Sequence, residues 1–350
     1  MEHVAERLLN DREQTILRAI VHTFVRQASP VGSRALSKQL QRELHLSAAT
    51  IRNVMADLED MGYIAHPHTS AGRVPTDRGY RLYVDSLMER ELLTAADTQQ
   101  VDVLAQRPKE QLFREASRIL GSLSYHLAVI QIPKVRDVLV RRVELVPLSS
   151  ERILVVLALQ SDILRTITIE SAGAIPDAQL HELASFINER VSGRPLSHID
   201  QALSGGSDAI RDAGPAFIRL FVERLQELDQ PSSGDLIHIS GTPQLLRHPE
   251  FEHPEKVRSV IELIDNEEVI VHVLDQVADN SSVAVRIGQE LGHERLQDYS
   301  VVSTTYCVGE ARGSVSLIGP KRMQYSRMMS LVQLVSDTLH TSLHQNASSS

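Results

Sequence analysis

Apolar side chains recur at helical spacing throughout the N-terminal part of the chain. Residues 12–27 carry one such stripe, and a second follows Gly32, where Ser33 can cap a helix that turns Leu36 and Leu40 inward. A third stripe is formed by Ile51, Val54, Met55, Leu58 and Met61. Steps of three and four residues place each stripe on one buried face of a helix. The pattern therefore predicts three consecutive amphipathic helices.

The third helix has start and stop signals at both ends. Ser47 is a good N-cap, and Leu46 with Ile51 stand at the spacing of a hydrophobic staple. Gly62 can adopt the left-handed conformation that commonly ends a helix. The connection at His45 is short, as a helix-turn-helix requires. These signals predict a helix over residues 48–61.

The face opposite the third stripe is suited to contact with DNA bases. It carries small and polar residues, namely Ala49, Asn53 and Ala56, with Thr50 and Arg52 on the flanks. Small residues allow close approach, whereas asparagine and arginine can hydrogen-bond adenine and guanine through two atoms. Acidic residues occur only at the far end of the helix, which suits entry into a groove by the N-terminus. An ordinary surface helix of a bundle would show the same caps and stripe.

The segment after this helix predicts a hairpin and a fourth helix. Residues 63–66 and 73–75 flank a tip rich in Pro, Thr, Ser, Ala and Gly. Thr76 can cap a helix that carries Arg81. Arg73 lies beside Gly72, where it could reach a phosphate or a narrow minor groove.

The remaining chain alternates between strand-like and helical patterns. After an amphipathic helix that ends near Tyr125, strands are predicted over residues 138–146, 153–159 and 163–169. Helical stripes follow over residues 180–191 and 217–228, then strands over residues 269–274, 282–287, 300–308 and 313–318, and a final helix over residues 328–339. This order predicts an α+β domain interrupted by an insertion. A chain of 350 residues is expected to form two or three domains.

The net charge of −9 is unevenly distributed. Residues 1–90 hold 12 Lys and Arg against 11 Asp and Glu, so the excess of acid lies in the rest of the chain. A near-neutral DNA-binding part on an acidic body is compatible with DNA binding where the basic groups share one face.

Motifs typical of enzymes do not occur in the sequence, which has no GxGxxG, Walker A, GxSxG or HExxH pattern. We therefore expect no catalytic residue and no cofactor. The run HPEFEHPE at residues 248–255 could hold a metal, but its prolines favour a solvated loop. The single Cys307 is expected to be buried in a strand and fits a reducing cytoplasm. The charged N-terminus and the short apolar runs predict neither a signal sequence nor a membrane span.

The run TIRNVMADLEDMGYI followed by PHTSAGRVPTDRGYRLYVDSL closely resembles the bacterial heat-inducible transcriptional repressor (HrcA) family. The resemblance implies an α+β multidomain protein with an N-terminal winged helix-turn-helix and a GAF-like domain that contains an inserted, mainly helical dimerisation domain. The expected ranges are 1–90 for the winged helix-turn-helix, 91–110 for a linker, 111–174 and 267–344 for the two parts of the GAF-like domain, 175–266 for the insertion and 345–350 for a disordered tail.

This resemblance also implies a function. The chain is expected to be a cytoplasmic homodimer that represses chaperone genes by binding an inverted-repeat double-stranded DNA operator called CIRCE. A GroEL-type chaperonin is expected to keep it active, and heat stress to relieve repression. The alternative is an effector-controlled transcription factor with a small-molecule ligand in the GAF-like domain, although the sequence shows no dedicated set of polar anchors for one.

The predicted DNA contacts fall into two groups. Bases would be read by Ala49, Thr50, Arg52 and Asn53. The DNA backbone would be contacted by Ser47, His68, Thr69, Arg73 and Arg81.

Overall fold

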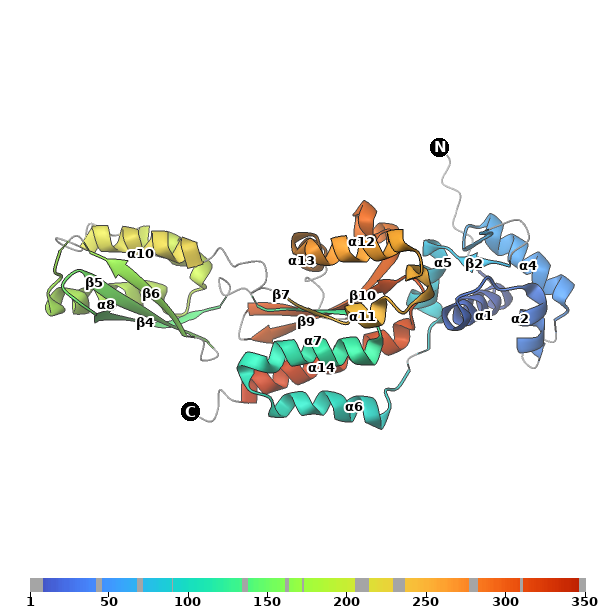
Figure 1. Ribbon diagram of the computed structural model, residues 1–350, viewed down its shortest axis with the longest axis horizontal. Coiled ribbons are helices and arrows are strands. Elements are labelled where there is room, and N and C mark those ends of the chain that lie inside the picture. Colours follow the sequence, from blue (N-terminus) through green and yellow to red (C-terminus); the bar gives the residue numbers. More distant parts are fainter. Residues whose placement is uncertain are drawn as a thin grey trace.

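The computed structural model is an α+β protein, and three units lie in a row along its longest axis (Figure 1). It describes residues 9–41, 46–67, 72–89, 91–133, 138–160, 164–171, 173–204, 214–228, 237–276, 283–308 and 311–345. We call residues 9–89 the N-terminal unit, residues 138–228 the inserted unit, and residues 91–133 with 237–345 the central unit. The central unit lies between the other two (Figure 1).

The N-terminal unit contains helices and one short hairpin. The helices are α1 (Asp11–Gln27), α2 (Ser33–Gln39), α4 (Ala48–Asp60) and α5 (Asp77–Leu82), and α5 continues into a π-helical turn, η1 (Tyr83–Leu87). Strands β1 (Ile64–Ala65) and β2 (Val74–Pro75) pair antiparallel between α4 and α5. The apolar stripes predicted from the sequence are buried here, with Ile16, Ile51 and Leu58 fully enclosed. Gly62 ends the third predicted helix in the left-handed conformation, as expected.

The central unit is built on a five-stranded antiparallel sheet in the order β7-β3-β10-β9-β8. Its strands are β3 (Leu127–Gln131), β7 (Ile237–Ser240), β8 (Ala284–Ile287), β9 (Tyr299–Val308) and β10 (Ala311–Pro320). Side chains alternate between the faces, so Ile130 and Leu317 pack towards one core while Val129 and Ile318 pack towards another. The sheet is therefore buried on both faces.

Helices cover both faces of this sheet (Figure 1). On one side lie α6 (Ala95–Asp102), α7 (Lys109–Ser124) and α14 (Tyr325–Gln345). On the other lie α11 (Thr242–Leu245), α12 (Pro254–Asp265) and α13 (Glu267–Asp275). The predicted stripe of the last helix, including Leu331, Val335 and Leu339, is fully buried against the sheet. Within the described residues, every helix is too short or too polar to pass through a lipid bilayer.

The inserted unit has a sheet and a core of its own. Strands β4 (Val140–Pro147), β5 (Arg152–Leu159) and β6 (Leu164–Glu170) pair antiparallel in the order β4-β5-β6. Helices α8 (Asp177–Val191), α9 (Ile199–Ser204) and α10 (Gly214–Leu228) pack on one face of this sheet. Phe221 and Val155 are fully buried in this core.

These sheets divide the chain differently from the expected ranges. The strands of residues 140–170 were expected in the first part of the GAF-like domain, but they form a separate sheet against α8 and α10. Residues 237–265 were expected in the insertion, but β7 pairs with β3 of the central unit and α12 packs there. Alternation along a strand shows that one face is buried, but not which sheet the strand joins.

Individual elements also differ from the sequence prediction. Residues 269–274 form part of helix α13 instead of a strand, with Ile270, Val273 and Leu274 buried at helical spacing. Strands β3 and β7 were not predicted. The expected linker over residues 91–110 contains α6, and its Val101 and Leu104 are fully buried. Cys307 lies in β9 but is only half-buried.

Candidate nucleic-acid interface

Helix α4 presents its predicted contact residues on one exposed face. Ile51, Val54, Met55 and Leu58 anchor the helix in the core of the N-terminal unit. The opposite face leaves Ala49, Arg52 and Asn53 exposed and Thr50 half-buried. In Figure 1, α4 lies on the part of the N-terminal unit that faces away from the central unit. The structure therefore brings together all four residues that were predicted to read bases.

Ser47 begins this helix in the predicted way. Its Oγ accepts a hydrogen bond from the Thr50 amide at 3.1 Å and lies 2.9 Å from Thr50 Oγ1. The N-cap side chain stays exposed, at the end of the helix where the backbone dipole is positive. A phosphate oxygen approaching this end would meet two hydroxyl groups and a favourable dipole.

A close backbone contact holds the hairpin against the segment before α2. Val31 and Arg73 exchange two backbone hydrogen bonds, of 2.8 and 2.9 Å. A Cβ on the neighbouring Gly72 would lie 2.4 Å from the Val31 carbonyl oxygen, so this position requires glycine. His68 and Thr69, which were predicted to contact the DNA backbone, lie outside the described residues.

Arg73 takes part in a cluster with Glu59 and His66. Its Nη2 lies 2.7 Å from Glu59 Oε2, its Nη1 contacts His66 Nε2, and His66 Nδ1 lies 2.6 Å from Glu59 Oε1. The Arg73 side chain is only 16% exposed. The guanidinium thus neutralises an acidic residue near the C-terminal end of α4, and its predicted phosphate contact would require it to share or leave Glu59.

Arg81 lies apart from the other predicted contact residues. Its Nε donates to Glu290 at 2.8 Å, its Nη2 to the Val285 carbonyl at 2.6 Å, and its Nη1 to Asp85 at 3.0 Å. Burial would raise the pKa of the Glu290 carboxyl, but hydrogen bonds from Arg81 and the Ile287 amide outweigh it and lower this pKa. In this structure Arg81 therefore links the N-terminal unit to the central unit.

The run at residues 248–255 is tied into the central unit, in contrast to the solvated loop expected from its sequence. His248 Nε2 lies 2.8 Å from the Tyr125 carbonyl, Glu250 pairs with Arg322, and Phe251 is buried. Among the residues that the structure describes, no group of three or more His, Cys, Asp or Glu side chains is arranged to hold a metal ion.

Comparison with known proteins identifies the family of this chain. Residues 110–329 match the family described as HrcA protein C terminal domain. A heat-inducible transcription repressor HrcA from Chlorobium phaeobacteroides (strain BS1) is 37% identical, with 96% of this chain and 98% of that protein covered. The chain belongs to the HrcA family. A second HrcA, from Ruminiclostridium cellulolyticum, is 32% identical, with 95% of this chain and 97% of the relative covered.

A solved structure has a similar fold to this chain. A crystal structure at 2.2 Å of a protein described as hypothetical aligns with a TM-score of 0.61 at 24% identity, covering 97% of this chain and 99% of that one. At this identity the likeness concerns the fold of the chain and not its function.

Sequence reasoning missed the residues that join the N-terminal and central units. Glu290 and Lys321 pair with Arg81 and Asp77, more than 200 positions earlier in the chain. Local periodicity carries no signal for such a pair. The only signal in the sequence is the group of charged residues around Asp77 and Arg81 at the start of a helix, which could have suggested ion pairs with another part of the chain.

Proposed function

We propose that this HrcA-family chain is a non-enzymatic repressor that reads DNA with its N-terminal unit, a winged helix-turn-helix. In this proposal α2 and α4 form the helix-turn-helix, and the β1–β2 hairpin is the wing. The exposed α4 face is the observation that carries it: a 13-residue helix, anchored by four buried apolar residues, presents two alanines, an asparagine and an arginine to solvent. Such a face can enter a major groove with its N-terminus first.

Bases are read by Asn53 and Arg52, with Ala49 and Thr50 in contact with the groove floor. Asn53 can hydrogen-bond adenine through two atoms, and Arg52 can do the same with guanine. Ser47 at the helix start contacts a phosphate, and the wing adds contacts from His68, Thr69 and Arg73. Arg81 is the exception, because Glu290, Asp85 and Val285 hold its guanidinium.

The charges on α4 favour this orientation. Arg52 lies in the N-terminal half, whereas the acids Asp57, Glu59 and Asp60 lie at the other end. Arg73 offsets the charge of Glu59. The helix therefore presents positive charge where it would meet phosphates and keeps negative charge away from them.

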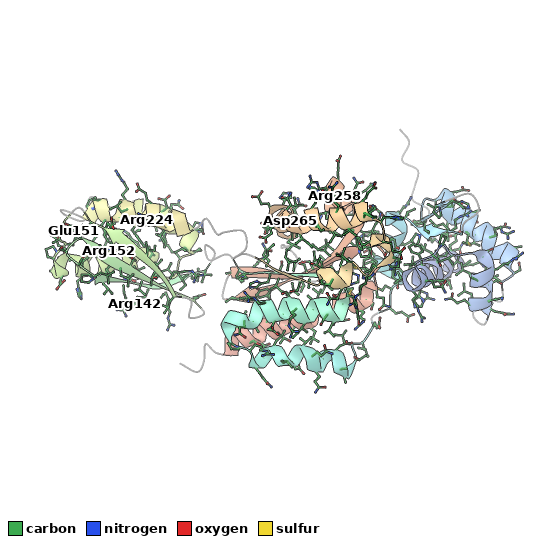
Figure 2. All side chains as sticks on the ribbon, in the orientation of Figure 1. Arg142, Glu151, Arg152, Arg224, Arg258 and Asp265 are labelled. Carbon is green, nitrogen blue, oxygen red and sulfur yellow. The ribbon has the colours of Figure 1, made fainter. Side chains whose placement is uncertain are left out.

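The inserted unit is proposed to make the homodimer through the uncovered face of its sheet. That face carries Val146, Leu154, Val156, Ala158 and Leu164 in register across β4, β5 and β6. Val146 and Leu164 are 41% and 62% exposed, and Arg142 and Glu144 lie at the rim of the same face. Figure 2 shows Arg142 extending from β4.

A second copy of this chain fits the uncovered face. An apolar centre with two arginines and two glutamates at its rim, Arg142, Glu144, Arg152 and Glu170, can pair with itself about a two-fold axis. Arg142 and Glu144 already pair with each other at 3.3 Å within one chain, so this rim can be buried without leaving their charges unpaired. Two-fold symmetry in the protein then matches the inverted repeat of the proposed operator, CIRCE.

Regulation is proposed to act on the amount of folded dimer. Domains have only about 5–15 kcal/mol of stability, so heat stress can deplete the DNA-binding form, and a GroEL-type chaperonin would restore it. The alternative is an effector bound by the central, GAF-like unit. A ligand specific to the folded state would raise the melting temperature, which a screen of metabolites would detect.

Operator binding by the variant Asn53→Ala tests the assignment of α4. Replacement should weaken binding to an inverted-repeat operator by about 1–3 kcal/mol, and relax the choice of base at one position per half-site. Gln99→Ala, which removes an exposed amide from α6 of the central unit, is the matched control and should bind as the parent does. Equal operator affinity of the Asn53→Ala variant and the parent would remove α4 from the interface.

A further inference from the structure

Helix α5 is held against one end of the central sheet by two ion pairs. Asp77 accepts from Lys321 Nζ at 2.6 Å and from the Gln289 amide at 3.2 Å. One turn later, Arg81 binds the Glu290 carboxylate and the Val285 carbonyl. The side chains of Asp77 and Lys321 are 29% and 30% exposed, so this pair is largely shielded from solvent. These two ion pairs, with the hydrogen bonds to the backbone of Gln289 and Val285, therefore fix the position of α5 on the central unit.

An apolar contact lies beside these ion pairs. The rings of Tyr80 and Tyr325 meet edge to face at 6.0 Å, and both side chains are almost fully buried. They belong to one continuous core that runs from the N-terminal unit into the central unit. Gly288 leaves room for the approach, because a Cβ there would lie 2.1 Å from Asp77 Oδ2. We call Asp77, Tyr80 and Arg81 with Glu290, Lys321 and Tyr325 the α5 contact.

Arg322, a third charged residue of the central unit, binds the end of α1. Arg322 Nη1 donates to the Val25 carbonyl at 2.7 Å, while its Nε and Nη2 bind Glu250 at 2.6 and 3.1 Å. Val25 is in the last turn of α1, where carbonyl groups lack partners within the helix. The Arg322 side chain is only 12% exposed, so the N-terminal unit is held at a second point.

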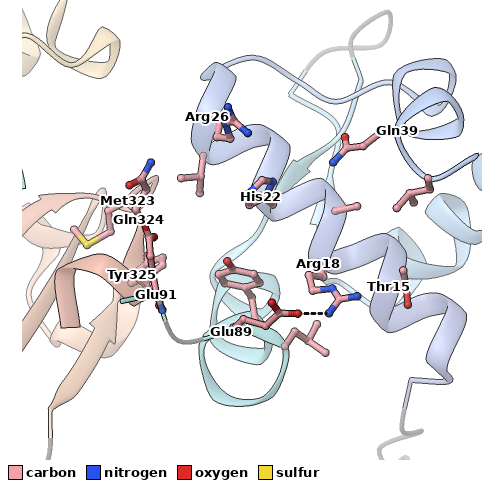
Figure 3. A pocket seen from close by; sticks show the side chains of 16 residues that line it. Thr15, Arg18, His22, Arg26, Gln39, Glu89, Glu91, Met323, Gln324 and Tyr325 are labelled. Carbon is pink, nitrogen blue, oxygen red and sulfur yellow. Dashed lines mark hydrogen bonds and ion pairs between the residues drawn. The ribbon is translucent and has the colours of Figure 1, made fainter. Parts of the chain in front are cut away.

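An open cavity lies beside these contacts, and both Val25 and Tyr325 line it. This cavity of about 750 Å³ separates Arg18, His22 and Arg26 of α1 from residues 323–326 of the central unit (Figure 3). The pair between Arg18 and Glu89, at 3.2 Å, is exposed there. The N-terminal unit is thus fixed along α5 and at the end of α1. If those contacts were lost, the cavity would leave the N-terminal unit space to rotate.

A dimer that reads an inverted repeat must hold its two recognition helices at a set separation and orientation. The path from the proposed dimer surface to α4 runs through the central unit and then through the α5 contact. A dimer with loosely tethered N-terminal units could bind pairs of half-sites at various spacings, whereas a dimer with docked N-terminal units binds them only over a narrow range of spacings.

We propose that the α5 contact determines which half-site spacing the dimer accepts, so that Glu290 and Lys321 are positioning residues for operator reading although they lie away from α4. This inference rests on the proposed function. It also gives Arg81 a role, since its guanidinium orients the DNA-binding unit instead of binding a phosphate.

Operators with altered spacing test the inference. Binding of the full chain is measured on the inverted repeat with its natural spacer and with spacers changed by one base pair up to about half a helical turn, ~5 bp. The parent should prefer one spacing. In the double variant Glu290→Gln with Lys321→Met, the ratio of affinities for the preferred and the altered spacings should be at least about tenfold smaller than in the parent. A tenfold change is the size of an ordinary coupling between sites. Its affinity for a single half-site should be unchanged.

Four further variants separate positioning from folding. Each single replacement, Glu290→Gln or Lys321→Met, should lower the preference by less than the double variant. Lys321→Arg keeps the charge opposite Asp77 and should retain the parental spacing profile. Glu115→Gln breaks an ion pair with Arg118 inside α7 and should also behave as the parent.

The outcomes distinguish the two proposals. A double variant that binds the half-site normally and keeps the parental spacing profile would overturn the inference while leaving the repressor proposal intact. A parent that shows no preference for the inverted repeat over unrelated DNA would overturn the proposed function itself.

Discussion

Replacing His126 should change how the stability of the central unit depends on pH. His126 lies at the start of β3 and is only 4% exposed. Its Nδ1 lies 2.5 Å from the Ser124 carbonyl, so Nδ1 carries the proton, and its Nε2 has no hydrogen-bond partner among the described residues. A Cβ on Gly319 would lie 1.9 Å from the ring, which leaves no space for water beside Cδ2. The ring therefore stays neutral in the folded protein.

Burial, aided by the nearby ring of His248, lowers the pKa of His126 from 6.5 to about 4. Between these values the unfolded chain binds a proton that the folded protein does not, so stability falls as the pH drops from about 6.5 to about 4. At about 1.4 kcal/mol per pH unit, the whole range corresponds to about 3 kcal/mol, of which about 2 kcal/mol is lost by pH 5.

Urea unfolding followed by circular dichroism at about pH 7 and about pH 5 measures this loss. The variant His126→Phe keeps a ring but cannot titrate, and should lose about 2 kcal/mol less than the parent between the two conditions. His126→Gln provides a second variant should phenylalanine not fit beside Gly319. His181→Gln removes an exposed histidine from α8 and should retain the parental pH dependence. Equal pH dependence in the parent and both His126 variants would refute the reasoning.

Three other predictions follow from the same structure. Arg73→Ala should weaken binding to all DNA sequences and reduce the slope of log affinity against log salt by about 0.9, measured by fluorescence anisotropy; an unchanged slope would remove the phosphate contact. Val156→Asp should turn the proposed dimer into a monomer in sedimentation velocity, whereas Ser149→Asp at a nearby turn should not; a dimeric Val156→Asp variant would exclude this face. Phe221→Ala should destabilise the inserted unit by about 3–5 kcal/mol in urea unfolding, and a loss below 1 kcal/mol would contradict the packing seen around this ring.

Local signals in the sequence predicted most of the N-terminal unit, although the N-cap of α2 is Gly32 and not Ser33. The Ser47 cap, the stripe from Ile51 to Leu58 and the Gly62 stop all act within one helix, and all three are found where the sequence predicts them. The exposed face of α4 follows from the same periodicity. These features depend on contacts between residues three or four positions apart, which one sequence displays directly.

Features that depend on distant contacts could not be predicted. The run EEVIVHVLD forms α13 because Ile270, Val273 and Leu274 meet the core of the central unit, although its β-branched residues favour a strand. The pattern within β4, β5 and β6 does not show which sheet these strands join, because that depends on which other strands they pair with. The partner of Arg81 is 209 positions away, so its role in docking was not visible.

A footprint on DNA from the promoter of a chaperone operon tests the central claim most directly. The account predicts two protected half-sites related by a two-fold axis, with protection lost in the Asn53→Ala variant and retained in Gln99→Ala. Absence of protection by the folded protein, or protection that is equally strong in the Asn53→Ala variant, would contradict the assignment of α4 as the DNA-reading helix.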